Sequence, residues 1–241
     1  MKNDTVALYV LILFIFQSLL SVQAEVIEVE YKRFYSHVKK LNSEDTQALQ
    51  FAFGFQHIHE PRLCEISSAR IVTQKQTIDL TVSSEYRFTM PTERALNLAD
   101  AVVTIDMADQ ANQCDMSVQL ETRSEFLKQY YSNEELVFIY QQYSAFFNQM
   151  GSFLSFMMPQ VDGLMINFEN RELDQQLRDA PQVVNGLLIL GVDWLDQNKP
   201  IVLPKVPLRI TARTPLCQDS CRLKFLLMDT TYATTFCRLR N

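Results

Sequence analysis

The feature of this sequence that most constrains its fold is a four-residue pattern that occurs twice, fifty residues apart. Cys64–Ser67 and Cys114–Ser117 each combine a cysteine, an acidic residue, an apolar residue and a serine. Strand-like apolar segments precede them, at 49–55 with alternating large residues and at 102–107. We therefore predict a duplicated ββ unit, with each copy forming an antiparallel hairpin whose second strand begins at the cysteine.

The repeated cysteines predict a disulfide. Alternation along a strand places Cys64 on the same face as Ile66, and Cys114 on the same face as Met116. Because the two cysteines hold equivalent positions on core-facing sides, we predict a Cys64–Cys114 bridge. The remaining cysteines cannot all pair within one chain, and either Cys217–Cys221 or a bridge to Cys237 stays open.

The first residues have the arrangement of a secretory signal peptide. Lys2 is positive, Val6–Phe16 is uninterruptedly apolar, and Val22–Ala24 has the small-x-Ala form that signal peptidase accepts. The apolar run is shorter than the roughly 20 residues that span a bilayer. We predict cleavage after Ala24 and a periplasmic or secreted protein, in whose oxidising surroundings the cysteines can pair.

A long apolar segment follows the second repeat. Ser132 and Glu135 form a capping-box pattern, no charged residue occurs from Leu136 to Met158, and Pro159 follows. Apolar residues recur there at intervals of three and four, so we predict a hydrophobic helix over Asn133–Met158. The apolar residues cover more than one side of this helix, which favours a core helix that lies on strands. The alternative is a groove that binds a lipid or a partner.

These patterns predict an α+β fold in which antiparallel hairpins pack on the long hydrophobic helix, with a β-rich C-terminal part. The predicted organisation is a signal peptide at 1–24, a main α+β domain at 25–170 and a β-rich basic region at 171–241. Shorter expected elements are a strand pair (77–82 and 85–89), a short helix (91–101), a strand (163–168), a helical turn (171–178), an Asn185-Gly186 turn, an apolar run (187–194) and a proline-punctuated extended segment (201–210).

Charge is segregated along the chain. The whole sequence carries a formal charge of -6, which argues against a nucleic-acid binder. Residues 199–241 instead hold eight basic and two acidic side chains. We predict that this basic set contacts an envelope partner or an anionic membrane surface, or else docks on the acidic remainder. Its members are Lys199, Lys205, Arg209, Arg213, Arg222, Lys224, Arg238 and Arg240.

Enzymatic motifs are weak. His57 and His59 would share one face of a strand and could hold a metal ion with a further ligand such as Glu60. The chain has only five glycines and contains neither a Gly-x-Ser-x-Gly motif nor a glycine-rich phosphate loop. We predict a non-enzymatic binding or interaction module without a cofactor. The alternative is a metal-dependent hydrolase that uses the two histidines.

Several of these motifs resemble a known family. The pattern Tyr31-x-x-Phe34-Tyr35, the two cysteine motifs, and the helix end and strand over 150–164 are similar to the bacterial Domain of Unknown Function family 2987. The resemblance covers roughly residues 31–168. It implies a gammaproteobacterial envelope protein. Since no activity is established for the family, the resemblance assigns no functional residues.

Overall fold

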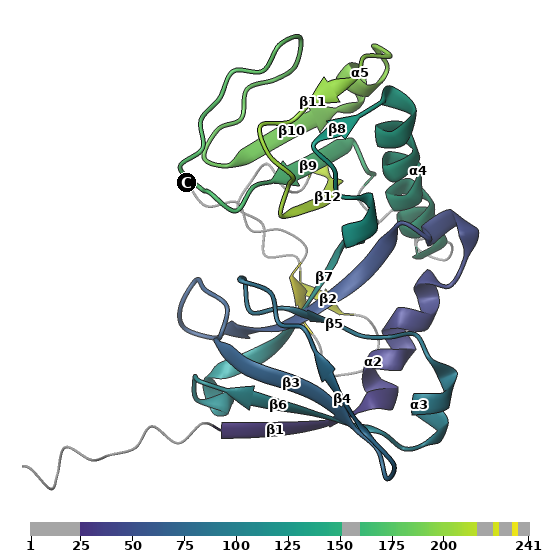
Figure 1. The fold of residues 1–241 in the computed structure, drawn as a ribbon, viewed down its shortest axis with the longest axis vertical. Coiled ribbons are helices and arrows are strands. Elements are labelled where there is room, and N and C mark those ends of the chain that lie inside the picture. Colours follow the sequence, from purple (N-terminus) through teal and green to yellow (C-terminus); the bar gives the residue numbers. More distant parts are fainter. Residues whose placement is uncertain (1–24, 151–159, 216–223, 227–232, 236–241) are drawn as a thin grey trace, which may run out of the picture.

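The computed structural model describes residues 25–150, 160–215, 224–226 and 233–235, the last two as backbone (Figure 1). The described chain forms two lobes, one above the other in Figure 1. The lower lobe contains strands β1–β7 with helices α2 and α3, and the upper lobe contains β8–β12 with α4 and α5. The buried apolar side chains of both lobes form one continuous cluster. The predicted signal peptide lies outside the described residues.

The lower lobe is built from two antiparallel sheets. One has the strand order β1-β6-β3-β4 and the other has the order β5-β2-β7. Their strands are β1 (Glu25–Glu30), β2 (Leu49–His57), β3 (Ile66–Val72), β4 (Thr77–Leu80), β5 (Phe88–Thr89), β6 (Val102–Met107) and β7 (Cys114–Thr122). The described part of the chain is therefore a mixture of helices and antiparallel strands, and the predicted α+β class is confirmed.

The predicted hairpins are wrong in their pairing. Strands form where the repeat predicts them, but β2 pairs with β7 along its whole length and β3 pairs with β6. Each predicted unit thus contributes one strand to each sheet. The single bridge Gln56↔Leu63 joins β2 to the segment that leads into β3. A two-stranded hairpin is marginal by itself, whereas exchange of strands between the units gives each sheet at least three strands.

The predicted disulfide joins the chain where the two units change sheets. Cys64 lies just before β3 and Cys114 is the first residue of β7, and the two are bonded with their Cα atoms 6.3 Å apart. Cys64 is fully buried. The bridge prediction is confirmed. The bond links the two places where the chain passes from one sheet to the other, which we call the crossing.

The segment between the repeats also divides between the sheets. The two expected strands do not pair with each other along their length. The first, β4, pairs with β3, and the second, β5, pairs with β2. Between the two segments there is the isolated bridge Val82↔Phe88. The predicted short helix is present as α3 (Arg94–Leu98).

A helix that the sequence analysis did not identify lies against the lower core. In α2 (Tyr31–Val38) the buried residues are Tyr31, Phe34 and Val38, at helical spacing. The Phe34 ring meets the Phe53 ring edge-on, with centroids 4.9 Å apart. Two short 3-10 turns, Lys39–Leu41 and Glu44–Thr46, then lead into β2.

The upper lobe is organised around α4 (Asn133–Met150). Its capping box has both expected bonds: the backbone N–H of Glu135 donates to Ser132 Oγ at 3.3 Å, and the N–H of Ser132 donates to a Glu135 carboxylate oxygen at 3.1 Å. The predicted continuation to Met158 falls on residues 151–159, outside the described part of the chain. No helix within the described ranges is long and apolar enough to cross a membrane.

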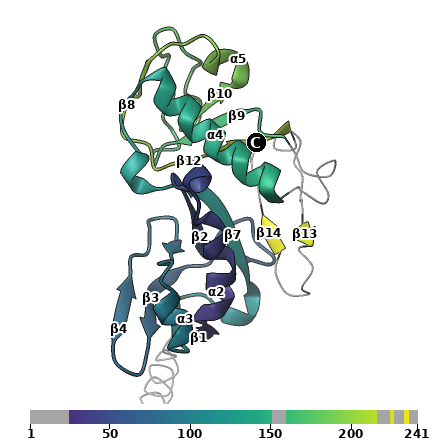
Figure 2. The same cartoon turned by 90° about the vertical axis from the view of Figure 1, so that its right-hand side faces the viewer.

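A three-stranded antiparallel sheet lies beside α4, with the order β10-β9-β12. Its strands come from both sides of position 170 in the sequence (Figure 2). The strands are β9 (Gly163–Asn167), β10 (Leu187–Gly191) and β12 (Arg209–Arg213), and the short helix α5 (Val192–Leu195) follows β10. Asn185 and Gly186 have φ angles of 50° and 70°, which confirms the predicted turn.

Residues 171–178 do not form the predicted helical turn. This segment consists of turns and the isolated bridge Gln175↔Val183. The backbone groups of Gln175 and Val183 bond to each other in both directions, so an extended pairing replaces the intrahelical bonds that a helix would need.

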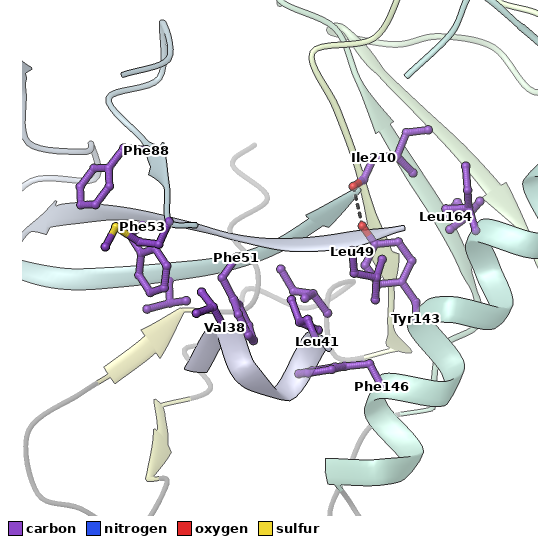
Figure 3. Close-up of a cluster of buried hydrophobic side chains, with 14 of the residues drawn as sticks. Val38, Leu41, Leu49, Phe51, Phe53, Phe88, Tyr143, Phe146, Leu164 and Ile210 are labelled. Carbon is purple, nitrogen blue, oxygen red and sulfur yellow. Dashed lines mark hydrogen bonds between the residues drawn. The ribbon is translucent and has the colours of Figure 1, made fainter. Parts of the chain in front are cut away.

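Buried polar groups of α4 connect the lobes. The Gln142 side chain is buried, and its oxygen accepts from the backbone N–H of Ala48 while its nitrogen donates to the Glu44 carbonyl. The Tyr143 hydroxyl donates to the Ile210 carbonyl at 2.6 Å and lies 3.1 Å from Thr122 Oγ1 (Figure 3). One turn of α4 therefore binds the linker before β2, the end of β7, and β12.

Candidate interaction surface

The largest group of exposed apolar side chains in the described residues is on a short ribbon of the upper lobe. Strand β8 (Tyr130–Tyr131) pairs antiparallel with β11 (Ile201–Val202). Tyr131 and Ile201 oppose each other and are 1% and 3% exposed, whereas Tyr130 and Val202 oppose each other and are 55% and 63% exposed. Because side chains alternate across a strand, the ribbon has one face in the core and one apolar outer face.

The inner face holds the ribbon in place. The Tyr131 hydroxyl donates to the Phe126 carbonyl at 2.9 Å and accepts from the backbone N–H of Lys128 at 2.7 Å. Burial raises the pKa of Tyr131 to about 12, so the phenol stays neutral and keeps both bonds at physiological pH. The N–H of Leu203 donates to the Gln129 carbonyl and extends the pairing by one further bond. The outer face is therefore presented on a fixed backbone.

A third exposed apolar side chain follows β11 in the sequence. Val206 is 58% exposed, and the side-chain amide of Gln129 donates to the Pro204 carbonyl, which ties the segment after β11 to the residue before β8. Tyr130, Val202 and Val206 are three of the seven large apolar side chains that are exposed in the described residues. The other four are on separate elements: Val26, Ile58, Leu98 and Val184.

Two lysines precede and follow Val202 in the sequence. Lys199 and Lys205 each lie three residues from Val202, both are exposed, and neither forms an ion pair with another residue in the described ranges. Lys128 is the third basic residue here, and its ammonium group contacts Glu135 at 2.5 Å. Its ammonium hydrogen bond keeps the pKa of the Glu135 carboxyl below its usual value.

Two of the predicted basic surface residues face acidic partners within the protein instead. The Arg209 guanidinium forms an ion pair with Glu85, which also accepts from Arg171 at 3.2 Å. Burial lowers the pKa of Arg209. Arg213 lies 3.6 Å from Asp162. Glu85 and Asp162 belong to the acidic part of the chain. Arg209 and Arg213 therefore dock on that part, as the alternative prediction for the basic residues proposed.

The rest of the basic set is described only in part. Lys224 begins strand β13 (Lys224–Leu226), which pairs with β14 (Ala233–Thr235), and only their backbone is described. Arg222, Arg238 and Arg240 lie outside the described residues, as do Cys217, Cys221 and Cys237. Of the eight predicted residues, Lys199 and Lys205 are therefore exposed in the segment that contains Val202, whereas Arg209 and Arg213 pair with acidic residues of the protein.

The two histidines do not share a strand face as predicted. Strand β2 ends at His57, so His59 lies in the following loop rather than on the same strand face. His57 Nδ1 accepts from the backbone N–H groups of His59 and Glu60, at 3.3 and 3.0 Å. Its Nε2 therefore carries the proton and donates to the Gln113 amide oxygen at 3.1 Å. Both ring nitrogens of His57 therefore form hydrogen bonds within the protein.

The loop around His57 is closed by ion pairs. Arg62 binds Asp109 with two parallel bonds of 2.7 and 2.9 Å and also contacts Glu60 at 2.5 Å. The Arg62 hydrogen bonds hold the pKa of the Asp109 carboxyl at about 2. Within the described residues, no three His, Cys, Asp or Glu side chains are grouped so that they could hold a metal ion. This cluster is a structural clamp beside the disulfide.

Sequence reasoning missed Tyr130 and Val202 as a pair. They are 72 positions apart, and each belongs to a strand of two residues, too short for a periodic signal. The one available signal was local: the prolines at 200 and 204 predict an extended edge segment, which β11 confirms.

The fold and the surface together define a two-lobed, disulfide-linked α+β protein with an exposed apolar ribbon. The family model described as "Protein of unknown function (DUF2987)" matches residues 23–168. Because this match covers more than half of the sequence, the chain belongs to that family, and the resemblance seen in the sequence is confirmed. Neither the curated proteins nor the solved structures contain a match to the chain.

Proposed function

We propose that this protein is an exported, non-enzymatic binding module of the cell envelope and that its contact face is the outer face of the β8–β11 ribbon. The observation that carries the proposal is the Tyr130–Val202 pair, in which an aromatic and an aliphatic side chain oppose each other and are both more than half exposed. Exposed apolar groups that cluster on a fixed backbone are typical of interaction sites. Tyrosine in particular is enriched at such sites.

Two further observations support export. The first residues have the signal-peptide arrangement that ends at Ala24. Cys64 is fully buried and bonded to the half-buried Cys114, and such bonds persist in oxidising compartments.

The hydrolase alternative has less support. His57 ends strand β2 and His59 lies in the loop that follows. The His57 ring bonds to the backbone of this loop and to the side-chain amide of Gln113. Metal analysis of the purified protein compares the two functions directly. A stoichiometric transition metal that is lost on His57→Ala with His59→Ala would favour the hydrolase.

The proposed contact face can be tested in cells by site-specific photocrosslinking. A photoreactive amino acid replaces Val202 in the full chain, and the matched control replaces Val184, which is 47% exposed on another segment of the upper lobe. We expect light-dependent adducts, to protein or to lipid, from position 202 and not from position 184. Equal adduct patterns at the two positions would refute the ribbon as the contact face.

A further inference from the structure

We infer that the ribbon binds the anionic surface of a phospholipid bilayer, an inference that rests on the proposed function and names its partner. It rests on an exposed apolar pair and on two exposed lysines nearby in the sequence, which form no ion pair with another residue that the structure describes. Val202 and Tyr130 form the pair, which we call the apolar centre, and Lys199 and Lys205 precede and follow Val202 in the sequence.

The residue types fit a headgroup layer. Lys199 and Lys205 are each three residues from Val202, and both are exposed. Flexible lysine side chains bring their ammonium groups to phosphates while the apolar centre contacts the acyl boundary. Tyrosine is enriched at this depth, since its ring is apolar and its hydroxyl can stay hydrated. The ribbon thus offers both contributions that peripheral binding needs.

The charges that face the ribbon set the strength of this binding. The segment 199–207 holds two lysines and no acidic residue. On the neighbouring helices, Glu135 is paired with Lys128, and Glu134 lies in the first turn of α4, where the helix dipole offsets its charge. Asp193 and Asp196, on α5 and directly after it, are exposed and oppose an anionic surface. We therefore expect weak, reversible binding that these two aspartates limit.

A second copy of the chain fits this face less well. In a twofold contact the same patch meets itself. The lysines of both copies would then share one rim, and like charges across an interface weaken association. A negatively charged lipid surface instead neutralises both lysines.

The test is co-sedimentation of the full chain with vesicles of phosphatidylcholine alone and of phosphatidylcholine with phosphatidylglycerol, at low and high salt. We expect binding only to the anionic vesicles, and less of it at high salt because the screening length falls well below 10 Å. Lys199→Glu with Lys205→Glu should weaken binding by about tenfold or more, since each lysine near such a surface contributes about 1 kcal/mol. Asp193→Asn with Asp196→Asn should strengthen it several-fold.

A charge-matched control keeps the test specific. Lys39→Glu with Lys75→Glu makes the same change in net charge on exposed positions of the lower lobe and should leave binding unchanged. Tyr130→Ser with Val202→Ser should weaken binding at either salt concentration. Equal binding to neutral vesicles, an equal loss in the control, or no sedimentation would each overturn the lipid inference. Photocrosslinks from position 202 to a protein alone would also overturn it while leaving the proposed contact face in place.

Discussion

Tyr143→Phe tests whether the two lobes form one cooperative unit. The substitution keeps the ring and removes only the hydroxyl, which joins α4 to the Ile210 carbonyl at 2.6 Å and to Thr122 Oγ1 at 3.1 Å. Tyr143 and Ile210 are fully buried and Thr122 is 1% exposed, so water cannot replace the lost bonds without a rearrangement.

The expected cost follows from the groups left behind. A buried donor or acceptor that loses its partner costs about 1–3 kcal/mol, and the carbonyl retains a second lone pair, so we expect a loss of about 2 kcal/mol in the free energy of unfolding. For a chain of this size that lowers the melting temperature by roughly 4–8 °C. Tyr140→Phe is the matched control: its hydroxyl donates to the Val161 carbonyl at 3.2 Å from a half-buried position, and its loss should cost less.

The assay is urea unfolding followed by tryptophan fluorescence and far-ultraviolet circular dichroism, since Trp194 reports on the upper lobe and circular dichroism reports on both. Coincident curves in the wild type, shifted together in Tyr143→Phe, would support one unit. Burial raises the pKa of Tyr143 well above 10, so its neutral phenol stabilises the fold below pH 10 and this contribution declines as the pH rises further. A Tyr143→Phe protein that is as stable as the wild type would refute the reasoning.

Three further predictions follow from the structure. Replacement of Cys64 and Cys114 by Ala should lower the free energy of unfolding by about 4 kcal/mol, as the chain-entropy model gives for a loop of about 50 residues, measured by urea unfolding. The pKa of Asp109 is about 2, below its usual value, so its contribution to stability is present above about pH 4 and is lost as the pH falls from 4 to 2; Asp109→Asn should flatten the stability profile in that window. Intact mass of the exported protein should correspond to a chain that begins at Glu25, and a mass that includes Met1 would contradict cleavage after Ala24.

Local signals predicted the elements well because their physics is local. The capping box before α4 depends on two residues three positions apart, and the Asn185-Gly186 turn depends on two neighbours that adopt positive φ. The disulfide was predicted from a repeat rather than from a contact. The repeat marks equivalent positions in the two predicted units, and these positions meet where each unit passes from one sheet to the other.

Strand partners could not be predicted in the same way. The residues of β2 form a good strand against either β3 or β7, since both offer alternating apolar residues. The choice between these partners depends on how the two predicted units bury their apolar faces together. Residues that are close in the sequence do not determine that arrangement. The shared strand face of the two histidines was predicted wrongly for a related reason: the prediction assumed that β2 continues through His59, whereas the strand ends at His57.

The contacts that hold the disulfide region and those that hold the ribbon are in different lobes. The disulfide and the Arg62–Asp109 ion pair hold the crossing of the lower sheets, while the ribbon is anchored by the Tyr131 hydroxyl, which donates to the Phe126 carbonyl. Among the described residues, no hydrogen bond or ion pair joins Tyr130–Tyr131 or Ile201–Val202 to Cys64, Cys114, Arg62 or Asp109. A disulfide acts chiefly by restricting the unfolded chain. A variant without the bridge, kept in conditions where it stays folded, should therefore bind anionic vesicles as the wild type does. If it binds more weakly while its circular dichroism is unchanged, the crossing and the ribbon are coupled through α4, and Tyr143 is the residue through which that coupling would pass.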